Sequence, residues 1–225
     1  TKEKEFHPIA DLFPLLEGDE YQALTADIAA NGLQEAIWLH QDGRIIDGRN
    51  RYRACLGAGV EPVFRTWNGE GSLLAFVVSM NVHRRHLNES QRAMVAAKIA
   101  NMEVGDNQHT GGSANLQTLD EKVSRADAGK LLNVSTRSVD SAAHVQREAV
   151  PEVVQAVERG HLSVSAAAEL AGEKEEVQRE AVRQIEEEGE KPADAIRAAK
   201  PHVAQNTNRG GGSGREKEPA TSHVR

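Results

Sequence analysis

The sequence predicts an α+β N-terminal domain followed by an all-α helix-turn-helix domain. Up to about residue 104, short runs of β-branched and aromatic residues alternate with segments of helical periodicity. Beyond a polar, glycine-rich stretch, apolar residues recur only at helical spacing. Aromatic residues make up 4% of the chain, which favours helical packing over a β-sandwich.

Changes in composition divide the 225 residues into five segments. They are an N-terminal domain at 1–104, a linker at 105–118, a helix-turn-helix domain at 119–172, a charged helical extension at 173–200 and a disordered tail at 201–225. The linker and the tail are mostly polar and glycine-rich, so they cannot bury enough apolar surface to build a core.

The elements of the N-terminal domain follow from periodicity and from turn residues. Helices are expected at 20–31, 49–57 and 72–82 and from residue 89 onward, and strands at 36–40, 44–47 and 63–67. Gly32 and Gly59 stand where the first two helices should end, and "QDGR" at 41–44 should form a hairpin turn. Asn88 and Gln91 match the capping pair of the fourth helix.

Helical segments fill the C-terminal half. They are expected at 125–132, 136–148, 151–159, 164–171 and 174–188. Ser124 can cap the first of them, and Pro151 opens the third at a position where its missing N–H is not needed. The last has a thin apolar stripe of Val177, Val182 and Ile185, which is too little for a strong coiled coil.

Charge and cysteine content exclude several classes of protein. The formal net charge is −7, from 27 basic and 34 acidic residues, so no global positive field attracts nucleic acid and anion binding must come from local clusters. The single cysteine, Cys55, excludes a disulfide scaffold and fits a reducing compartment. No signal peptide and no apolar run of about 20 residues is visible, so we expect a cytoplasmic protein without a membrane partner.

One local cluster is the stretch "IIDGRNRYRACLGAG" at 45–59, in which Arg49, Arg51 and Arg53 follow Gly48 at alternate positions. A helix N-terminus offers unpaired N–H groups and a positive dipole end, and glycine lets the backbone approach a ligand closely. Guanidinium groups add forked donors suited to phosphate oxygens. The pattern is therefore typical of a phosphate pocket; the alternative is a solvated basic helix paired with nearby carboxylates. Those carboxylates belong to Asp42, Asp47 and Glu61.

A second cluster, "SMNVHRRHLNES" at 79–90, places two arginines, two histidines and an asparagine between two expected helices. Two histidines without a cysteine or carboxylate at ligand spacing do not make a metal site, so no metal is expected here.

The two clusters resemble motifs of the ParB family. "DGRNRYRACLGAGV" resembles the family's "GERRxRAxxxAG" segment, and "MNVHRRHLNESQ" resembles "ENxQRxxLxPxE". "NGLQEAIWL" resembles its Gly-x-x-Gln-Pro run entering a strand, with Glu35 and Ala36 in place of Gln and Pro. The similarity covers residues 6–104 and continues into a helix-turn-helix region like those of ParB and KorB. It implies the ParB/sulfiredoxin-like fold for the N-terminal domain.

The resemblance also implies that the two clusters bind a nucleotide triphosphate. ParB proteins bind CTP, which Mg²⁺ can accompany, and use it to switch a homodimer between open and clamped states on double-stranded DNA. The residues that the resemblance and the phosphate pattern assign to the nucleotide are Gly48, Arg49, Asn50, Arg51, Arg53, Ala54, Asn81, Arg84 and Arg85.

Several positions depart from the family pattern. Arg49 and Asn50 stand where the family has Glu and Arg, and Met80 replaces the glutamate linked to nucleotide turnover. A thioether cannot accept a proton or orient a water, so at most a weak CTPase activity is expected. The sulfiredoxin branch is disfavoured because Arg49 occupies the place of its catalytic cysteine and Cys55 belongs on a buried helix face.

The stretch "ADAGKLLNVSTRSVDSAAHV" at 126–145 fits a DNA-reading helix pair. Gly129 stands where two helices cross closely, and Asn133 occupies a turn position that often demands positive φ, which Asn tolerates. Arg137, early in the second helix, is expected to contact a guanine edge or a phosphate. The expected DNA contacts are Ser135, Thr136, Arg137, Ser138, Asp140, Ser141 and His144. The alternative is an ordinary helical hairpin in a bundle.

Together, these patterns predict a ParB-like, nucleoid-associated DNA-binding protein of a bacterial chromosome, plasmid or phage, in which a nucleotide switches DNA binding or clamping. Plasmid partition and transcription regulation are the roles expected of it. Two alternatives stay open. One is a ParB-like nuclease, for which no carboxylate cluster beyond Asp42 and Asp47 is visible beside the arginines. The other is a regulator or adaptor with a degenerate pocket.

Overall fold

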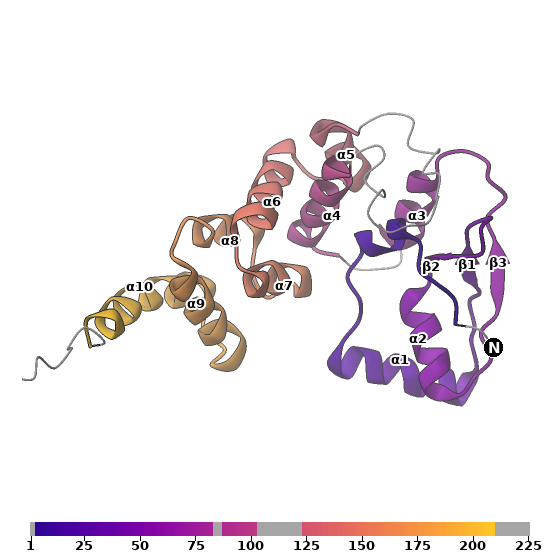
Figure 1. The fold of residues 1–225 in the computed structure, drawn as a ribbon, viewed down its shortest axis with the longest axis horizontal. Coiled ribbons are helices and arrows are strands. Elements are labelled where there is room, and N and C mark those ends of the chain that lie inside the picture. Colours follow the sequence, from indigo (N-terminus) through magenta and orange to yellow (C-terminus); the bar gives the residue numbers. More distant parts are fainter. Residues whose placement is uncertain (1–2, 83–86, 103–122, 210–225) are drawn as a thin grey trace, which may run out of the picture.

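The computed structural model describes residues 3–82, 87–102 and 123–209, and for 201–209 the backbone alone. An α+β part and a helical part follow one another along the long axis of the molecule, as the sequence predicts (Figure 1). The linker expected at 105–118 lies outside the described residues.

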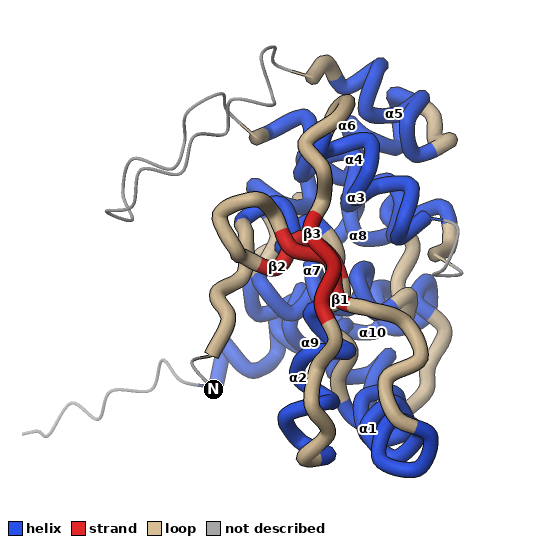
Figure 2. The backbone as a smooth tube through the Cα atoms, turned by 90° about the vertical axis from the view of Figure 1, so that its right-hand side faces the viewer, coloured by secondary structure: helices blue, strands red, loops and turns tan. Residues whose placement is uncertain are grey.

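Three short strands form one sheet. They are β1 (Ile37–Leu39), β2 (Ile45–Asp47) and β3 (Phe64–Thr66). β1 lies in the middle, antiparallel to β2 and parallel to β3 (Figure 2). The expected hairpin turn joins β1 to β2: His40 N–H donates to Arg44 O at 2.8 Å, and Gly43 has a φ of +87°. β2 ends at Asp47, two residues before the start of the arginine-rich helix at Arg49.

Helices α1 (Gly18–Asn31) and α2 (Arg49–Ala58) pack against each other at one end of the sheet. Ile28 of α1 forms a shared core with Ala54 and Cys55 of α2. Burial raises the pKa of the Cys55 thiol, although Arg51 acts in the opposite direction, so the thiol stays protonated. Cys55 is a core residue, as its place on a helix face predicts.

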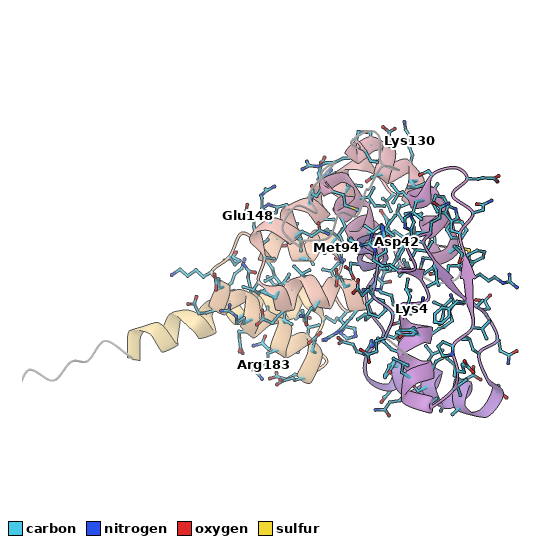
Figure 3. All side chains as sticks on the ribbon, turned by 45° about the vertical axis from the view of Figure 1, so that its right-hand side comes forward. Lys4, Asp42, Met94, Lys130, Glu148 and Arg183 are labelled. Atoms are coloured by element: carbon cyan, nitrogen blue, oxygen red, sulfur yellow. The ribbon has the colours of Figure 1, made fainter. Side chains whose placement is uncertain are left out.

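Three helices lie between the sheet and the helical part. They are the 3-10 helix η1 (Pro8–Leu12), α3 (Leu73–Val82) and α4 (Glu89–Asn101). The expected capping box of α4 is confirmed, because the side chains of Asn88 and Gln91 each accept from the other's backbone N–H. Met94 of α4 is 1% exposed and belongs to a core that runs from η1 into the helical part (Figure 3). α4 thus packs on the helical part rather than on the sheet.

Helices α5 to α10 make up the rest of the described chain. They are α5 (Arg125–Leu132), α6 (Thr136–Glu148), α7 (Pro151–Arg159), α8 (Val164–Leu170), α9 (Glu175–Glu187) and α10 (Pro192–Arg209). The apolar stripe of α9 is used inside the molecule, since Val177, Val182 and Ile185 are buried and α9 packs on α7 and α10.

α10 continues to Arg209, past residue 201 where a disordered tail is expected to begin. Residues 210–225 of that expected tail lie outside the described residues. Ala195, Ile196 and Ala199 are buried and fix the first turns of this helix against its neighbours. Extending an existing helix adds one hydrogen bond per residue and needs no new nucleus, so polar residues can follow. Neither α10 nor any other described helix is both long and apolar enough to cross a bilayer.

Replacing Gly129 by alanine should destabilise the protein by about 1–3 kcal/mol. A Cβ at Gly129 would lie 2.9 Å from Val134 O, a backbone atom of the turn between α5 and α6. Gly57 of α2 is the control: the nearest atom to its Cβ would be 3.5 Å away, so alanine there should stabilise by up to about 1 kcal/mol. Urea unfolding of both variants checks this, and a Gly129→Ala protein as stable as wild type would contradict the close crossing.

Candidate functional site

The turn between β2 and α2 requires glycine. Gly48 has a φ of +96°, and a Cβ there would meet the Arg51 guanidinium at 3.0 Å and an Ile37 side-chain carbon at 3.3 Å. The N-cap of α2 is Gly48, which has no side chain to cap the helix, and the first N–H groups of α2 have no intrahelical acceptor. They add the positive end of the helix dipole to the arginines that follow. We call residues 48–53 the arginine turn.

Arg51 faces a buried polar centre. Its Nη2 donates to Asp47 Oδ2 at 2.7 Å and its Nη1 donates to Glu35 Oε2 at 2.6 Å. Asn81 Nδ2 of α3 donates to Asp47 Oδ1 at 3.0 Å and to Val77 O at 2.9 Å. Asp47 is 7% exposed and Asn81 is 6% exposed. Asp47 therefore joins Arg51 to Asn81, two residues that the sequence assigns to one site.

Arg49 and Arg53 lie on another face of α2, four residues apart, and hold residues 11–17, which we call the 11–17 segment. Arg49 pairs with Asp11 and donates from Nη2 to Phe13 O at 2.6 Å. Arg53 donates from Nη1 to Leu16 O at 3.3 Å. Burial lowers the pKa of Arg49, opposed by the nearby Asp11 carboxylate, and the guanidinium stays charged.

Two further contacts involve the same side of α2. Asn50 Oδ1 accepts from Leu16 N–H at 3.1 Å, and the guanidinium carbon of Arg53 lies 4.6 Å from the centre of the Tyr21 ring. Leu16 lies in a stretch without regular secondary structure, so side chains of α2 supply hydrogen bonds that a helix or strand would otherwise provide.

A small cavity of about 180 Å³ opens beside the Arg51–Glu35 pair. It is lined by Gln34, Glu35, Ala36, Trp38, Arg65 and Met80. These residues come from the stretch before β1, from β1 and β3, and from the end of α3. The cavity thus brings together the three stretches "NGLQEAIWL", "VFRTW" and "SMNV".

The structure does not place the remaining residues expected at the nucleotide, Ala54, Arg84 and Arg85, in this site. Ala54 is 0% exposed and packs in the core between α1 and α2, so its side chain cannot touch a ligand. Arg84 and Arg85 lie outside the described residues. The sequence did not indicate Glu35 or Asp11 as partners of the arginines, because both lie far from them along the chain.

The helices α5 and α6 have the local geometry expected of them. Asn133 is left-handed with a φ of +52°, and Val134 N–H donates to Gly129 O at 2.9 Å. Ser135 caps α6 through its side chain, which accepts from Ser138 N–H. Ser138 Oγ also lies 3.2 Å from Glu89 Oε1, so these two serines hold the helix in place.

The first turns of α6 expose the side chains expected to read DNA. Thr136, Arg137 and Asp140 are exposed, and Ser141 and His144 are half-buried. Asp140 Oδ1 accepts from Arg125 Nη1 at 2.9 Å. Arg137 has no ion-pair partner among the residues that the structure describes, so its charge is available to a ligand.

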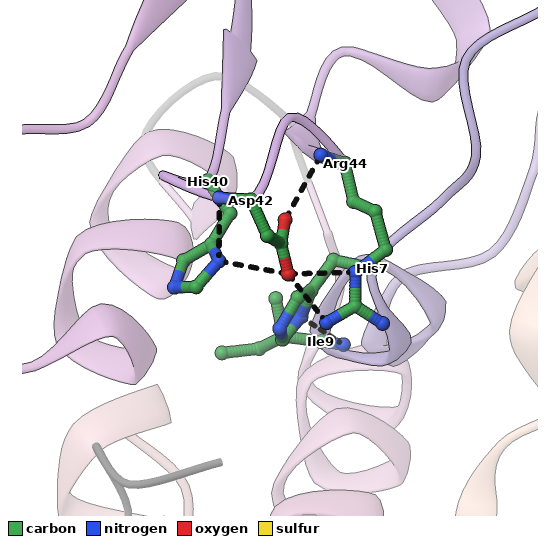
Figure 4. A network of polar contacts seen from close by, with 5 residues as sticks. All are labelled: His7, Ile9, His40, Asp42 and Arg44. Carbon is green, nitrogen blue, oxygen red and sulfur yellow. Dashed lines mark hydrogen bonds and ion pairs between the residues drawn. The ribbon is translucent and has the colours of Figure 1, made fainter. Parts of the chain in front are cut away.

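A third polar cluster lies at the β1–β2 turn (Figure 4). Donor atoms of His7, His40 and Asp42 lie within 4.8 Å of one another. The Asp42 carboxylate is already paired with Arg44, which donates to its Oδ2 atom from Nε at 2.8 Å and from Nη2 at 2.6 Å. Burial raises the pKa of Asp42, but the hydrogen bonds from Arg44 lower it to about 2. A metal ion would have to displace this guanidinium, so we assign no metal to the cluster.

Comparison with known proteins finds structural neighbours. No protein-family model matches the chain, and no curated protein matches its sequence. One similar structure is the C-terminally truncated chromosome-partitioning protein ParB from Caulobacter crescentus complexed to the centromeric parS site. Its identity to this chain is 16% and its TM-score 0.35, over 85% of this chain and 97% of that one.

Two further structures are similar. The truncated Caulobacter crescentus ParB complexed with CTP-gamma-S matches at 17% identity and a TM-score of 0.27, over 78% of this chain and 95% of that one. A Pnob8-like ParB-N domain matches at 14% identity and a TM-score of 0.47, over 82% and 88% of the two chains.

The buried His7 should make stability depend on pH. Its Nδ1 accepts from Ile9 N–H at 3.2 Å, and burial together with Arg44 lowers its pKa from 6.5 to about 4. Between these values the unfolded chain binds a proton that the folded protein does not. The free energy of unfolding should therefore fall by about 3 kcal/mol as the pH drops from 6.5 to 4, and this contribution should level off below pH 4.

Urea unfolding at several pH values measures this slope. The His7→Asn variant keeps a side-chain acceptor for Ile9 N–H but does not titrate, so its curve should be flatter over the same range. Equal slopes for the variant and wild type would contradict the assignment to His7.

Proposed function

We propose that this chain is a ParB-like DNA-binding protein whose α+β part holds a nucleotide triphosphate, CTP, and whose α5–α6 helix pair reads double-stranded DNA. The observation that carries the proposal is the arginine turn. A helix N-terminus without a capping side chain on Gly48, a glycine at positive φ and the Arg51 guanidinium converge there. This combination suits phosphate oxygens. The small cavity adjoins the turn through Glu35, the partner of Arg51, and the residues of the turn themselves do not line it.

Arg51 is the phosphate ligand that we favour. Unlike Arg49 and Arg53, it faces the side of the turn where Asn81 and the cavity lie. A phosphate would take the place of the Glu35 and Asp47 carboxylates around it. Mg²⁺ bound to the nucleotide would reduce the repulsion between the phosphates and these carboxylates.

Met80 supports binding rather than rapid turnover. It lines the cavity where the related motif has a glutamate, and a thioether neither accepts a proton nor orients a water. We therefore infer that the nucleotide acts as a bound effector, with at most weak hydrolysis. DNA binding, homodimer formation and a role in partition or transcription regulation belong to the same proposal.

A second candidate function is that of a DNA-binding regulator with an empty pocket. It is favoured by the contacts of the three arginines, each of which already has acceptors within the protein. An anion must compete with these internal partners. The two candidates differ in whether nucleotide binds at all, and a thermal-shift screen with CTP, ATP, GTP and UTP, with and without Mg²⁺, separates them.

Replacing Arg51 by alanine should weaken CTP binding by at least about tenfold, because one charge-assisted phosphate contact is lost. Calorimetry in the presence of Mg²⁺ measures the affinity. Arg183→Ala is the control, because Arg183 of α9 forms surface ion pairs with Glu180 of the same helix and with Glu188, which follows it. Full affinity in Arg51→Ala protein would exclude the proposed pocket.

Replacing Arg137 by alanine should weaken specific DNA binding by about 1–3 kcal/mol. The DNA probe is a site selected from a random pool with the full chain, and a gel-shift titration gives the affinity. Arg179→Ala, on α9, should bind like wild type. If Arg137→Ala binds the selected site as tightly as wild type, α6 does not read DNA through this residue.

A further inference from the structure

We propose that the ion pair between Glu17 and Arg159 is a latch that couples the arginine turn to the helical part of the molecule. Arg159 Nη2 lies 2.9 Å from Glu17 Oε2, although the two residues are 142 positions apart in the chain. The inference deepens the proposed function and rests on it where it invokes a nucleotide, because it names how the phosphate site would act on the DNA-binding part.

The first link of the latch is the 11–17 segment. Its backbone is held by α2 at three points: Arg49 binds Phe13 O, Asn50 binds Leu16 N–H and Arg53 binds Leu16 O. Glu17 follows directly as the residue that opens α1, and its side chain makes no cap there. The position of Glu17 therefore depends on the side chains of the arginine turn.

The second link is the C-terminal end of α7. Besides Glu17, Arg159 pairs with Glu186 of α9 at 3.5 Å, and His161 Nδ1 lies 3.2 Å from the same carboxylate. Hydrogen bonding to Glu17 is the main cause that raises the pKa of Arg159, which keeps it charged. Lys98 of α4 pairs with the neighbouring Glu158 at 2.6 Å and fixes the end of α7.

Glu17 and Arg159 both line a groove of about 830 Å³. Its lining includes Leu15 and Leu16 on one side and Gln91, Glu158 and His161 on the other. Leu12 and Phe13 are buried in the core, whereas Leu15 is 38% exposed and Leu16 is half-buried. Residues 15–17 therefore have room to move when the contacts of Leu16 and Glu17 are lost, while the start of the segment stays packed.

The sequence of events follows from competition for the arginines. An anion bound by Arg51 draws this side chain away from Asp47 and Glu35 and shifts the first turn of α2. The contacts of Arg49 and Arg53, on another face of the same turn, to the 11–17 segment then weaken. Glu17 then loses its fixed position, and its pair with Arg159 opens. Exposed ion pairs are weak, so the latch is suited to being opened by a ligand rather than to holding the parts permanently.

A double-mutant cycle tests the coupling without any nucleotide. The readout is hydrogen exchange of residues 13–20 in the full chain, which includes the Leu16 amide held by Asn50. Arg53→Gln and Arg159→Gln should each raise exchange there by about two- to fivefold, and the double variant should exchange less than the product of the two effects. Arg179→Gln is the matched control and should leave this exchange unchanged.

A second pair of variants guards against simple unfolding. Glu17→Gln should raise the exchange as Arg159→Gln does, and the two combined should exchange no faster than Arg159→Gln alone, because each removes the same ion pair. Exchange of α5 serves as the internal reference for the fold. Independent effects of Arg53→Gln and Arg159→Gln, or additive effects of Glu17→Gln and Arg159→Gln, would overturn the latch.

A nucleotide arm separates this inference from the proposed function. With CTP and Mg²⁺ present, exchange of residues 13–20 in wild type should rise. If calorimetry detects CTP binding but the exchange does not change, the latch is wrong and the pocket stands. If CTP does not bind at all, the proposed pocket fails, and the mutant cycle alone decides whether the arginine turn and Arg159 are coupled.

Discussion

Three guanidinium groups lie within one turn and a half of α2 and repel one another. The α+β part offsets this repulsion, because it provides hydrogen-bond acceptors for each of them. Arg51 has the carboxylates of Asp47 and Glu35, whereas Arg49 and Arg53 have Asp11 and backbone carbonyls of the 11–17 segment. The groups suited to holding phosphate therefore also hold the chain together. A ligand at this turn has to compete with internal contacts, and that competition is what can transmit its binding to other parts of the molecule.

The helical part is connected to the arginine turn, so that a change in the arginine contacts could reach it. α4 shares one apolar core with α5 to α8, so α6, the helix proposed to read DNA, is fixed to the same body as α7. Arg159 at the end of α7 reaches back to the 11–17 segment. A displacement of that segment would consequently alter the contacts of the helices packed with α6, which carries Arg137 and Asp140.

Local patterns in the sequence predicted local structure well. Glycine and asparagine at positions of positive φ, serine and asparagine caps, and apolar spacing identified the β1–β2 turn, the capping box of α4 and the turn between α5 and α6. These features depend on residues within about four positions of one another, so their physics is contained in a short stretch of sequence.

The partners of the arginines could not be predicted in the same way. Asp11 is 38 positions from Arg49 and Glu35 is 16 positions from Arg51, so only the packed fold brings them together. The same holds for His7, whose burial beside Arg44 arises from the bridge between the N-terminal segment and β2. Ala54 was assigned to the ligand by motif alone, but the packing of α1 on α2 buries its side chain.

The ¹⁵N spectrum of the arginine side chains, recorded during titration with CTP and Mg²⁺, reports whether phosphate replaces the internal partners of the arginine turn. If phosphate replaces the internal partners, the Nε–Hε resonance of Arg51 should shift and saturate with the same Kd as calorimetry gives, while that of Arg183 stays in place. Resonances of Arg49, Arg51 and Arg53 that do not move at saturating nucleotide would show that these guanidinium groups serve the fold alone.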